Sequence, residues 1–206
     1  MTVRNGDDSP VGADEALARL MEGNERFLRG EPRITHTPRE ALAELSKGQR
    51  PFATILGCSD SRVPPELIFD AGFGDLFIIR VAGNIASPGV AGSLQYACTH
   101  LGTQLVMVLG HERCGAVEAA LASKFAGAQE RSRIEWLLQN ILPGLHEIDP
   151  QLPPLQQLAC AVEANVRWTM RQILDAPEGR ASVAEGRMKL QGAVCEIASG
   201  RVRLLA

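Results

Sequence analysis

Two stretches of the chain decide its fold: residues 52–62, with the sequence FATILGCSDSR, and residues 104–115, with the sequence QLVMVLGHERCG. In each, a short apolar run with β-branched members ends at a glycine, and cysteine, histidine and charged residues follow at once. A third apolar run spans Leu76–Val81. Short apolar runs of this kind are typical of strands that are buried on both faces of a parallel sheet.

Helical segments separate these three runs. We expect a short helix at Pro65–Asp70 and a longer one at about Gly89–Leu101, which gives the order β-α-β-α-β. This order predicts an α/β domain built on a parallel sheet. Apolar spacing and capping residues predict further helices at 14–29, from Pro38 to about Lys47, and at 115–126, 130–142 and 154–175, followed by strand-like runs at 190–197 and 201–205.

The composition of the 206 residues, with 45% hydrophobic and 22% charged, is typical of one folded globular domain. We expect a flexible tail at residues 1–13 and a single domain at 14–206. A net charge of −3 argues against a nucleic-acid partner, and no apolar run reaches the roughly 20 residues of a membrane span. The N-terminus lacks the apolar part of a secretory signal, and five cysteines are an odd number, so we expect a cytoplasmic protein with free thiols.

Potential metal ligands follow two of the three predicted strands. Cys58 and Asp60 come directly after the first strand, and His111 and Cys114 come after the third. Because ligand sites in open α/β sheets lie beyond the carboxyl ends of the strands, neighbouring strands would bring these side chains together. Two thiolates and one imidazole suit tetrahedral zinc and leave a fourth position to water. The sequence therefore predicts a zinc site at this edge of the sheet.

Asp60 gives the predicted site two alternative forms. As a fourth ligand it would close the zinc shell, whereas turned away it would leave zinc open to water. Arg62 is the natural partner of a carboxylate held off the metal, because a guanidinium matches a carboxylate bidentately. A purely structural zinc is the competing interpretation, but a carboxylate beside an arginine is unusual in such sites. The remaining cysteines lie within apolar segments and are expected in the core: Cys98, Cys160 and Cys195.

Five motifs around these residues resemble the β-class carbonic anhydrases. They are Cys58-Ser-Asp60-Ser-Arg62-Val-Pro-Pro-Glu66, Gly74-Asp-Leu-Phe77, Arg80-Val-Ala-Gly-Asn84, Ser93-Leu-Gln-Tyr96-Ala97 and Gly110-His111-x-x-Cys114-Gly115-Ala-Val. The resemblance covers roughly residues 14–205. It implies a sheet of four parallel strands with an added edge strand, flanked by helices, and an N-terminal helical arm that wraps a partner subunit. A homodimer or a dimer of dimers is therefore expected.

The resemblance also implies the chemistry: a carbonate dehydratase with one Zn²⁺ per chain, which interconverts carbon dioxide and bicarbonate through a zinc-bound hydroxide. The implied metal ligands are Cys58, His111 and Cys114, joined by Asp60 only in the closed form. Asp60 and Arg62 would be the catalytic dyad. The positions implied to bind substrate are Gln49, Phe77, Tyr96 and Gly115, the last through its backbone amide.

Two rival functions stay open at this point. A hydrolase of carbonyl sulfide or carbon disulfide would use the same fold and zinc shell, and a non-catalytic zinc-binding module would keep the metal without turnover. One position departs from part of the family. Members with an inhibitory bicarbonate site usually carry a tryptophan three residues before the first ligand, where this chain has Ile55. We therefore expect an open zinc shell at neutral pH.

Overall fold

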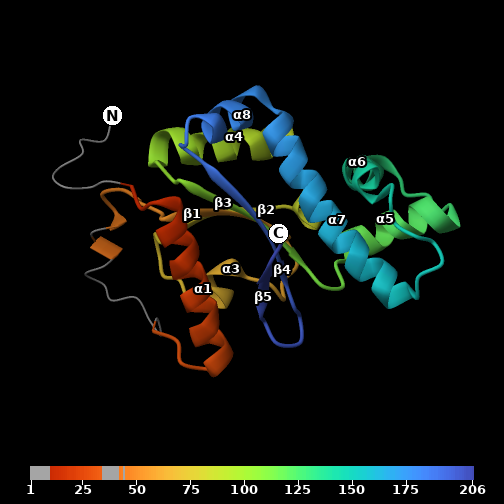
Figure 1. Cartoon of the computed structure of the whole chain (residues 1–206), viewed down its shortest axis with the longest axis horizontal. Coiled ribbons are helices and arrows are strands. Elements are labelled where there is room, and N and C mark those ends of the chain that lie inside the picture. Colours follow the sequence, from red (N-terminus) through yellow and green to blue (C-terminus); the bar gives the residue numbers. More distant parts are fainter. Residues whose placement is uncertain (1–9, 34–41, 44) are drawn as a thin grey trace.

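The computed structural model describes residues 10–33, 42–43 and 45–206 (Figure 1). Most of the tail expected at residues 1–13 lies outside the described residues. Half of the helix expected between Pro38 and Lys47, residues 38–41 and 44, does so too.

A five-stranded sheet forms the centre of the molecule, and its strands are β1 (Ala53–Gly57), β2 (Leu76–Arg80), β3 (Leu105–His111), β4 (Lys189–Cys195) and β5 (Val202–Leu204). They lie in the order β2-β1-β3-β4-β5. The first four strands are parallel, and β5 pairs antiparallel with β4 at the edge. The expected four parallel strands and edge strand are thus confirmed.

Helices cover both faces of the sheet. On one face lie α1 (Ala13–Arg29) and α3 (Pro65–Ile68), and on the other lie α4 (Pro88–Tyr96), α5 (Gly115–Ala126), α6 (Ser132–Ile141) and α7 (Pro154–Asp175). Every residue of β1 and β3 is buried, because alternate side chains enter the two cores. Ile55 and Met107 pack toward α1, whereas Leu56 and Val108 pack toward α7.

Two helical segments differ from the prediction. The helix expected at 89–101 is α4 followed by a π-helical segment, Ala97–Leu101, which ends at Gly102 in the left-handed conformation. A further helix, α8 (Pro177–Ala184), packs on α7 and was not predicted. It contains no buried residue, so it has no apolar periodicity that a sequence pattern could reveal.

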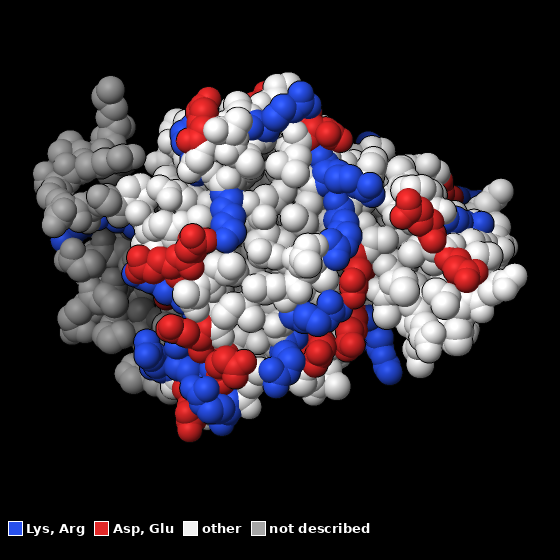
Figure 2. All heavy atoms as spheres, in the orientation of Figure 1, with Lys and Arg blue, Asp and Glu red and all other residues white. Residues whose placement is uncertain are grey.

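In the part of the chain that the structure describes, every helix is too short or too polar to cross a bilayer. Figure 2 shows acidic and basic side chains intermixed over the viewed face.

Candidate metal centre

The candidate centre lies where β1 and β3 end side by side. Residues Gly57 and Leu109 are paired in the parallel register, so Cys58, one residue further, lies level with the end of β3. His111 is the last residue of β3, and Cys114 is the N-cap of α5. The topology therefore brings the ligands of both stretches to one edge, as the sequence predicts.

The three side chains form a compact and buried set of donors. The ligand atoms of Cys58, His111 and Cys114 all lie within 4.8 Å of one another, and the two sulfurs are 4.0 Å apart. Tetrahedral zinc with Zn–S bonds of 2.3 Å would hold two sulfurs about 3.8 Å apart. The spacing in the structure thus fits one metal ion with little movement.

The imidazole of His111 has the tautomer that a metal ligand needs. Its Nδ1 lies 2.8 Å from the carbonyl oxygen of Glu112, and since a carbonyl only accepts, Nδ1 carries the proton and donates it. In the neutral imidazole, Nε2 then carries the lone pair that a metal ligand needs. This nitrogen is buried and has no hydrogen-bond partner among the described residues. A buried acceptor without a partner is costly, and a metal ion between it and the sulfurs would satisfy it.

The two thiols lie within hydrogen-bond distance of each other, with their sulfurs 4.0 Å apart. The hydrogen bond from Cys114 holds the pKa of Cys58 well below its usual range, and the same interaction, with burial, raises the pKa of Cys114. Burial alone would lower the pKa of His111, but its contact with the Cys58 thiolate raises it. Negative charge therefore lies on the Cys58 sulfur, in an environment that favours a cation.

Asp60 lies beside the cluster but is bound to Arg62. The guanidinium of Arg62 donates from Nε to Oδ1 at 2.9 Å and from Nη2 to Oδ2 at 2.7 Å, and its backbone N–H donates to Oδ1 at 3.0 Å. These hydrogen bonds hold the pKa of Asp60 well below its usual range. Oδ2 is 3.9 Å from Nε2 of His111. The carboxylate is thus ionised, close to the metal position and turned to Arg62.

Arg62 and Arg80 hold the loops that carry Cys58, Asp60 and Cys114 through hydrogen bonds to backbone carbonyls. The sequence patterns did not predict these hydrogen bonds. Arg62 Nη2 also donates to the carbonyl of Arg113 at 3.2 Å, which ties the loop after β1 to the loop after β3. Arg80, at the end of β2, donates to the carbonyls of Cys58 at 2.9 Å and Asp60 at 2.5 Å. The Arg80-Val-Ala-Gly-Asn84 motif was the available signal for this second contact.

The positions expected to bind substrate are more scattered. Gly115 begins α5 directly after Cys114, and a Cβ there would meet nothing described within 4 Å, so open space lies beside it. Gln49 is exposed. Phe77 is paired with Thr54, four residues before Cys58, or about 13 Å along the strand.

The ring contacts of Tyr96 are with two side chains outside the cluster. Its ring centroid lies 6.1 Å from that of Phe77 and 5.2 Å from that of His100. Within the described chain, Phe77 and Tyr96 therefore contact each other rather than the Cys-His-Cys cluster.

Of the cysteines expected in the core, only Cys195 is fully buried, and burial raises its pKa to about 11. Cys98 is half-buried. Cys160 is exposed, so the prediction for it was wrong. It lies on α7, and an amphipathic helix has a solvent face even where its sequence contains apolar residues.

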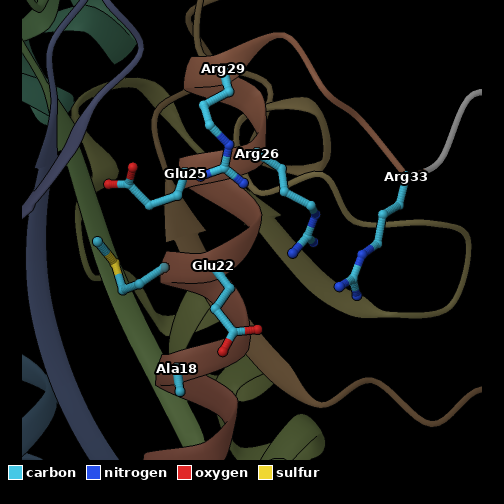
Figure 3. Close-up of a pocket in the computed structure, with 7 residues that line it drawn as sticks. Ala18, Glu22, Glu25, Arg26, Arg29 and Arg33 are labelled. Carbon is cyan, nitrogen blue, oxygen red and sulfur yellow. The ribbon is translucent and has the colours of Figure 1, made fainter.

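A separate hollow of about 590 Å³ lies along α1, away from the cluster, and Figure 3 shows its lining. Charged side chains of both signs border it, and one of them, Arg26, forms an ion pair with Asp70 at 2.5 Å. None of the three candidate metal ligands lines this hollow. We assign it no chemistry.

Comparisons with known proteins agree with the geometry. Residues 53–202 match the carbonic anhydrase family. A carbonic anhydrase of Mycolicibacterium smegmatis is 34% identical over 197 residues, or 95% of this chain and 93% of its own length. Carbonic anhydrase 2 of Mycobacterium tuberculosis is 43% identical over 137 residues, a match that spans 66% of this chain and 65% of that protein.

Solved structures show the same fold. The β-carbonic anhydrase CcaA superposes with a TM-score of 0.73 at 27% identity, covering 92% of this chain and 95% of that one. A tetrameric enzyme of Sordaria macrospora gives 0.73 at 23% identity, with 92% and 96% covered, and at that identity it supports the fold alone.

Proposed function

The chain belongs to the β-class carbonic anhydrase family, and on that premise we propose that it catalyses the reversible hydration of carbon dioxide to bicarbonate and a proton. The observation that carries the proposal is the cluster of Cys58, His111 and Cys114, in which His111 offers a free Nε2, beside an Asp60 held by Arg62. The fold alone is not sufficient evidence for this activity, because proteins of one fold can have different functions that depend on the residues of the site.

We propose that these three residues hold one Zn²⁺ per chain. Zinc supplies the Lewis acidity that lets water act as a nucleophile near neutral pH. The two sulfurs and Nε2 would hold the ion and leave room for a further ligand, and Oδ2 of Asp60 lies 3.9 Å from Nε2.

Asp60 is the orienting acceptor in this mechanism, and Arg62 keeps it in place. Because Arg62 holds the pKa of Asp60 well below its usual range, the carboxylate stays ionised at every pH at which such an enzyme works. An ionised carboxylate only accepts hydrogen bonds. Asp60 therefore orients the attacking water by accepting a hydrogen bond from it. The carboxylate does not become protonated. The export of the proton falls to other groups.

The backbone amide of Gly115 is the best supported of the substrate contacts. It opens the first turn of α5, where helical N–H groups have no intrahelical partner, and open space lies beside it. An N–H in this position can donate to an oxygen of bicarbonate. The roles of Gln49, Phe77 and Tyr96 rest on the motif resemblance alone.

The resting site is proposed to be open at neutral pH, with Asp60 bound to Arg62 and not to zinc. Both carboxylate oxygens are already engaged by the guanidinium, which supports this form. Zinc X-ray absorption at neutral and acidic pH tests it. A zinc bonded to Asp60 with no exogenous ligand at neutral pH would contradict it.

Three further features are proposed with the activity. Residues 14–206 form a single domain, the protein works as a homodimer or a dimer of dimers, and it is cytoplasmic. The tetrameric Sordaria macrospora enzyme supports the assembly. Light scattering at several protein concentrations tests it.

The activity is tested by stopped-flow hydration of carbon dioxide, run alongside hydrolysis of carbonyl sulfide and carbon disulfide. We expect carbon dioxide to be turned over fastest. Faster turnover of a sulfur compound would replace the proposal with the hydrolase, and zinc binding without turnover of any of the three would leave a non-catalytic module.

A further inference from the structure

Gly83 donates a hydrogen bond to one of the candidate ligand sulfurs. Its backbone nitrogen lies 3.4 Å from Sγ of Cys58. Gly83 belongs to the short 3-10 turn Ala82–Asn84 that follows β2, so this donor comes from a third strand end, one that carries no ligand. Hydrogen bonds to a ligand sulfur draw electron density from it and so tune the metal that it binds.

The direction of this N–H depends on an unusual backbone conformation. Gly83 has φ 69° and ψ 16°, in the left-handed region. A Cβ at this position would lie 2.7 Å from Cδ1 of Ile141 and 3.2 Å from Cβ of Ala116. Glycine is therefore required here both for the backbone angle and for the space. The adjacent Asn84 also has positive φ, 44°.

Asn165 of α7 holds the other side of Gly83. Its Nδ2 donates to the carbonyl oxygen of Gly83 at 2.8 Å, and the contact is buried. The amide lies among apolar neighbours such as Val162 and Val166, and its Oδ1 has no partner among the described residues. Burying the Asn165 amide with only one of its polar atoms hydrogen-bonded costs free energy. The hydrogen bond to Gly83 is the best explanation for an asparagine at this position.

The same helix lies directly on the strand that carries His111. A Cβ on Gly110 would come 2.6 Å from Cγ2 of Val166, so α7 and β3 approach as closely as glycine permits. Val166 follows Asn165 in the helix. One turn of α7 therefore fixes both the turn that contacts Cys58 and the end of β3 that presents His111.

We propose that Asn165 is a positioning residue of the metal centre. By holding Gly83, Asn165 keeps the hydrogen bond from Gly83 to the Cys58 sulfur in place. That hydrogen bond limits the charge that the sulfur donates to the metal. The inference rests on the proposed zinc function. Asn165 itself touches no reacting atom.

The test compares three proteins: wild type, Asn165→Leu and Thr169→Val. Leucine has the same branching and the same number of side-chain heavy atoms as asparagine, but it cannot donate to Gly83. Thr169 lies one turn further on the buried face of α7, and its hydroxyl has no partner among the described residues, so its valine variant removes a buried polar atom without touching Gly83. Each protein is freed of zinc and loaded with Co²⁺. The readouts are the thiolate-to-cobalt charge-transfer band and the Co²⁺ dissociation constant, measured against a competing chelator.

In Asn165→Leu we expect the charge-transfer band to move to longer wavelength, because a sulfur without its hydrogen bond gives up charge more easily. Metal binding should weaken about tenfold, because the turn at Gly83 no longer holds Cys58 in place beside the other two ligands. Thr169→Val should match the wild type in both readouts. Circular dichroism checks folding, and Asn165→Ala replaces the leucine variant if the latter does not fold.

The inference is overturned if Asn165→Leu keeps the wild-type band and affinity, or if Thr169→Val changes both as strongly, since the effect would then be one of packing. A wild-type protein that binds Co²⁺ without a thiolate band would instead overturn the metal centre itself. A wild type that shows the band but does not hydrate carbon dioxide would overturn only the proposed activity, and the three proteins would still decide the role of Asn165.

Discussion

Replacing Arg62 with alanine separates the proposed catalytic role of Asp60 and Arg62 from the proposed metal binding by Cys58, His111 and Cys114. Of the three hydrogen bonds that Arg62 makes to Asp60, the substitution removes the two from the guanidinium and leaves the one from the backbone. It also removes the contact with the Arg113 carbonyl. Arg62 has no hydrogen bond or ion pair with Cys58, His111 or Cys114 among the described contacts, so the zinc content should not change.

The size of the effect follows from what Asp60 then becomes free to do. Losing a single preorganised donor at a reacting oxygen commonly lowers kcat by about 100-fold to 1,000-fold. Arg62 acts through Asp60 rather than on the substrate, and its side chain is 46% exposed, so water replaces part of its role. We therefore expect carbon dioxide hydration to fall by at least about tenfold. The freed carboxylate, whose Oδ2 lies 3.9 Å from Nε2 of His111, can also reach the metal.

The assay is stopped-flow hydration of carbon dioxide at neutral pH, with zinc content measured on the same samples. Arg19→Ala is the matched control, because it removes an exposed arginine that pairs with Glu15 on α1 and lies over the Phe52 ring, and none of the described contacts joins it to the cluster. Arg62→Lys should give an intermediate rate, since lysine keeps the charge but lacks the bidentate geometry. Turnover in Arg62→Ala at the level of Arg19→Ala would refute the dyad, and loss of zinc in Arg62→Ala would show that the arginine serves metal retention instead.

Three further outcomes are expected. His111→Ala should lose most of the zinc and the activity together, by metal analysis and stopped flow. His146→Ala, which changes an exposed histidine that contacts Pro143 and Glu147, should keep both; full zinc occupancy in His111→Ala would contradict the ligand assignment. Folding lowers the pKa of Asp60, so the ionised carboxylate should stabilise the fold at every pH above its unfolded pKa of about 3.9. This stabilisation should disappear as the pH falls through the lower pKa of the folded state. The difference in unfolding free energy between wild type and Asp60→Asn should therefore stay constant from pH 8 to pH 5 and shrink below pH 4. Gly110→Ala should lower the unfolding free energy by about 1–3 kcal/mol in denaturant titrations, because the new Cβ would lie 2.6 Å from Val166; unchanged stability would mean that α7 can shift away from β3.

The strands and the cluster of Cys58, His111 and Cys114 could be predicted from sequence, because each rests on a local signal and the signals have one geometric consequence. An apolar run that stops at Gly57 and is followed by Cys58 identifies a strand and its end, and the same holds for Gly110 and His111. Parallel pairing then requires the two ends to meet. No knowledge of side-chain contacts is needed for that step.

The contacts that support the site could not be predicted, because each joins segments far apart in the chain. Asn165 lies 82 residues from Gly83, and nothing in either local pattern indicates the other. Helix α8 shows no apolar periodicity in the sequence, because none of its residues is buried. Cys160 was misplaced because the residue type suggests burial, while the helix turns that position to solvent.

The central claim is that Cys58, His111 and Cys114 hold a zinc ion that makes this chain a carbonic anhydrase. It is tested most directly by titrating zinc-free protein with Zn²⁺ while measuring carbon dioxide hydration by stopped flow. The account predicts activity that rises in proportion to added zinc and reaches its plateau at one equivalent per chain. Activity that is independent of zinc, or no turnover at a full equivalent of bound zinc, would contradict it.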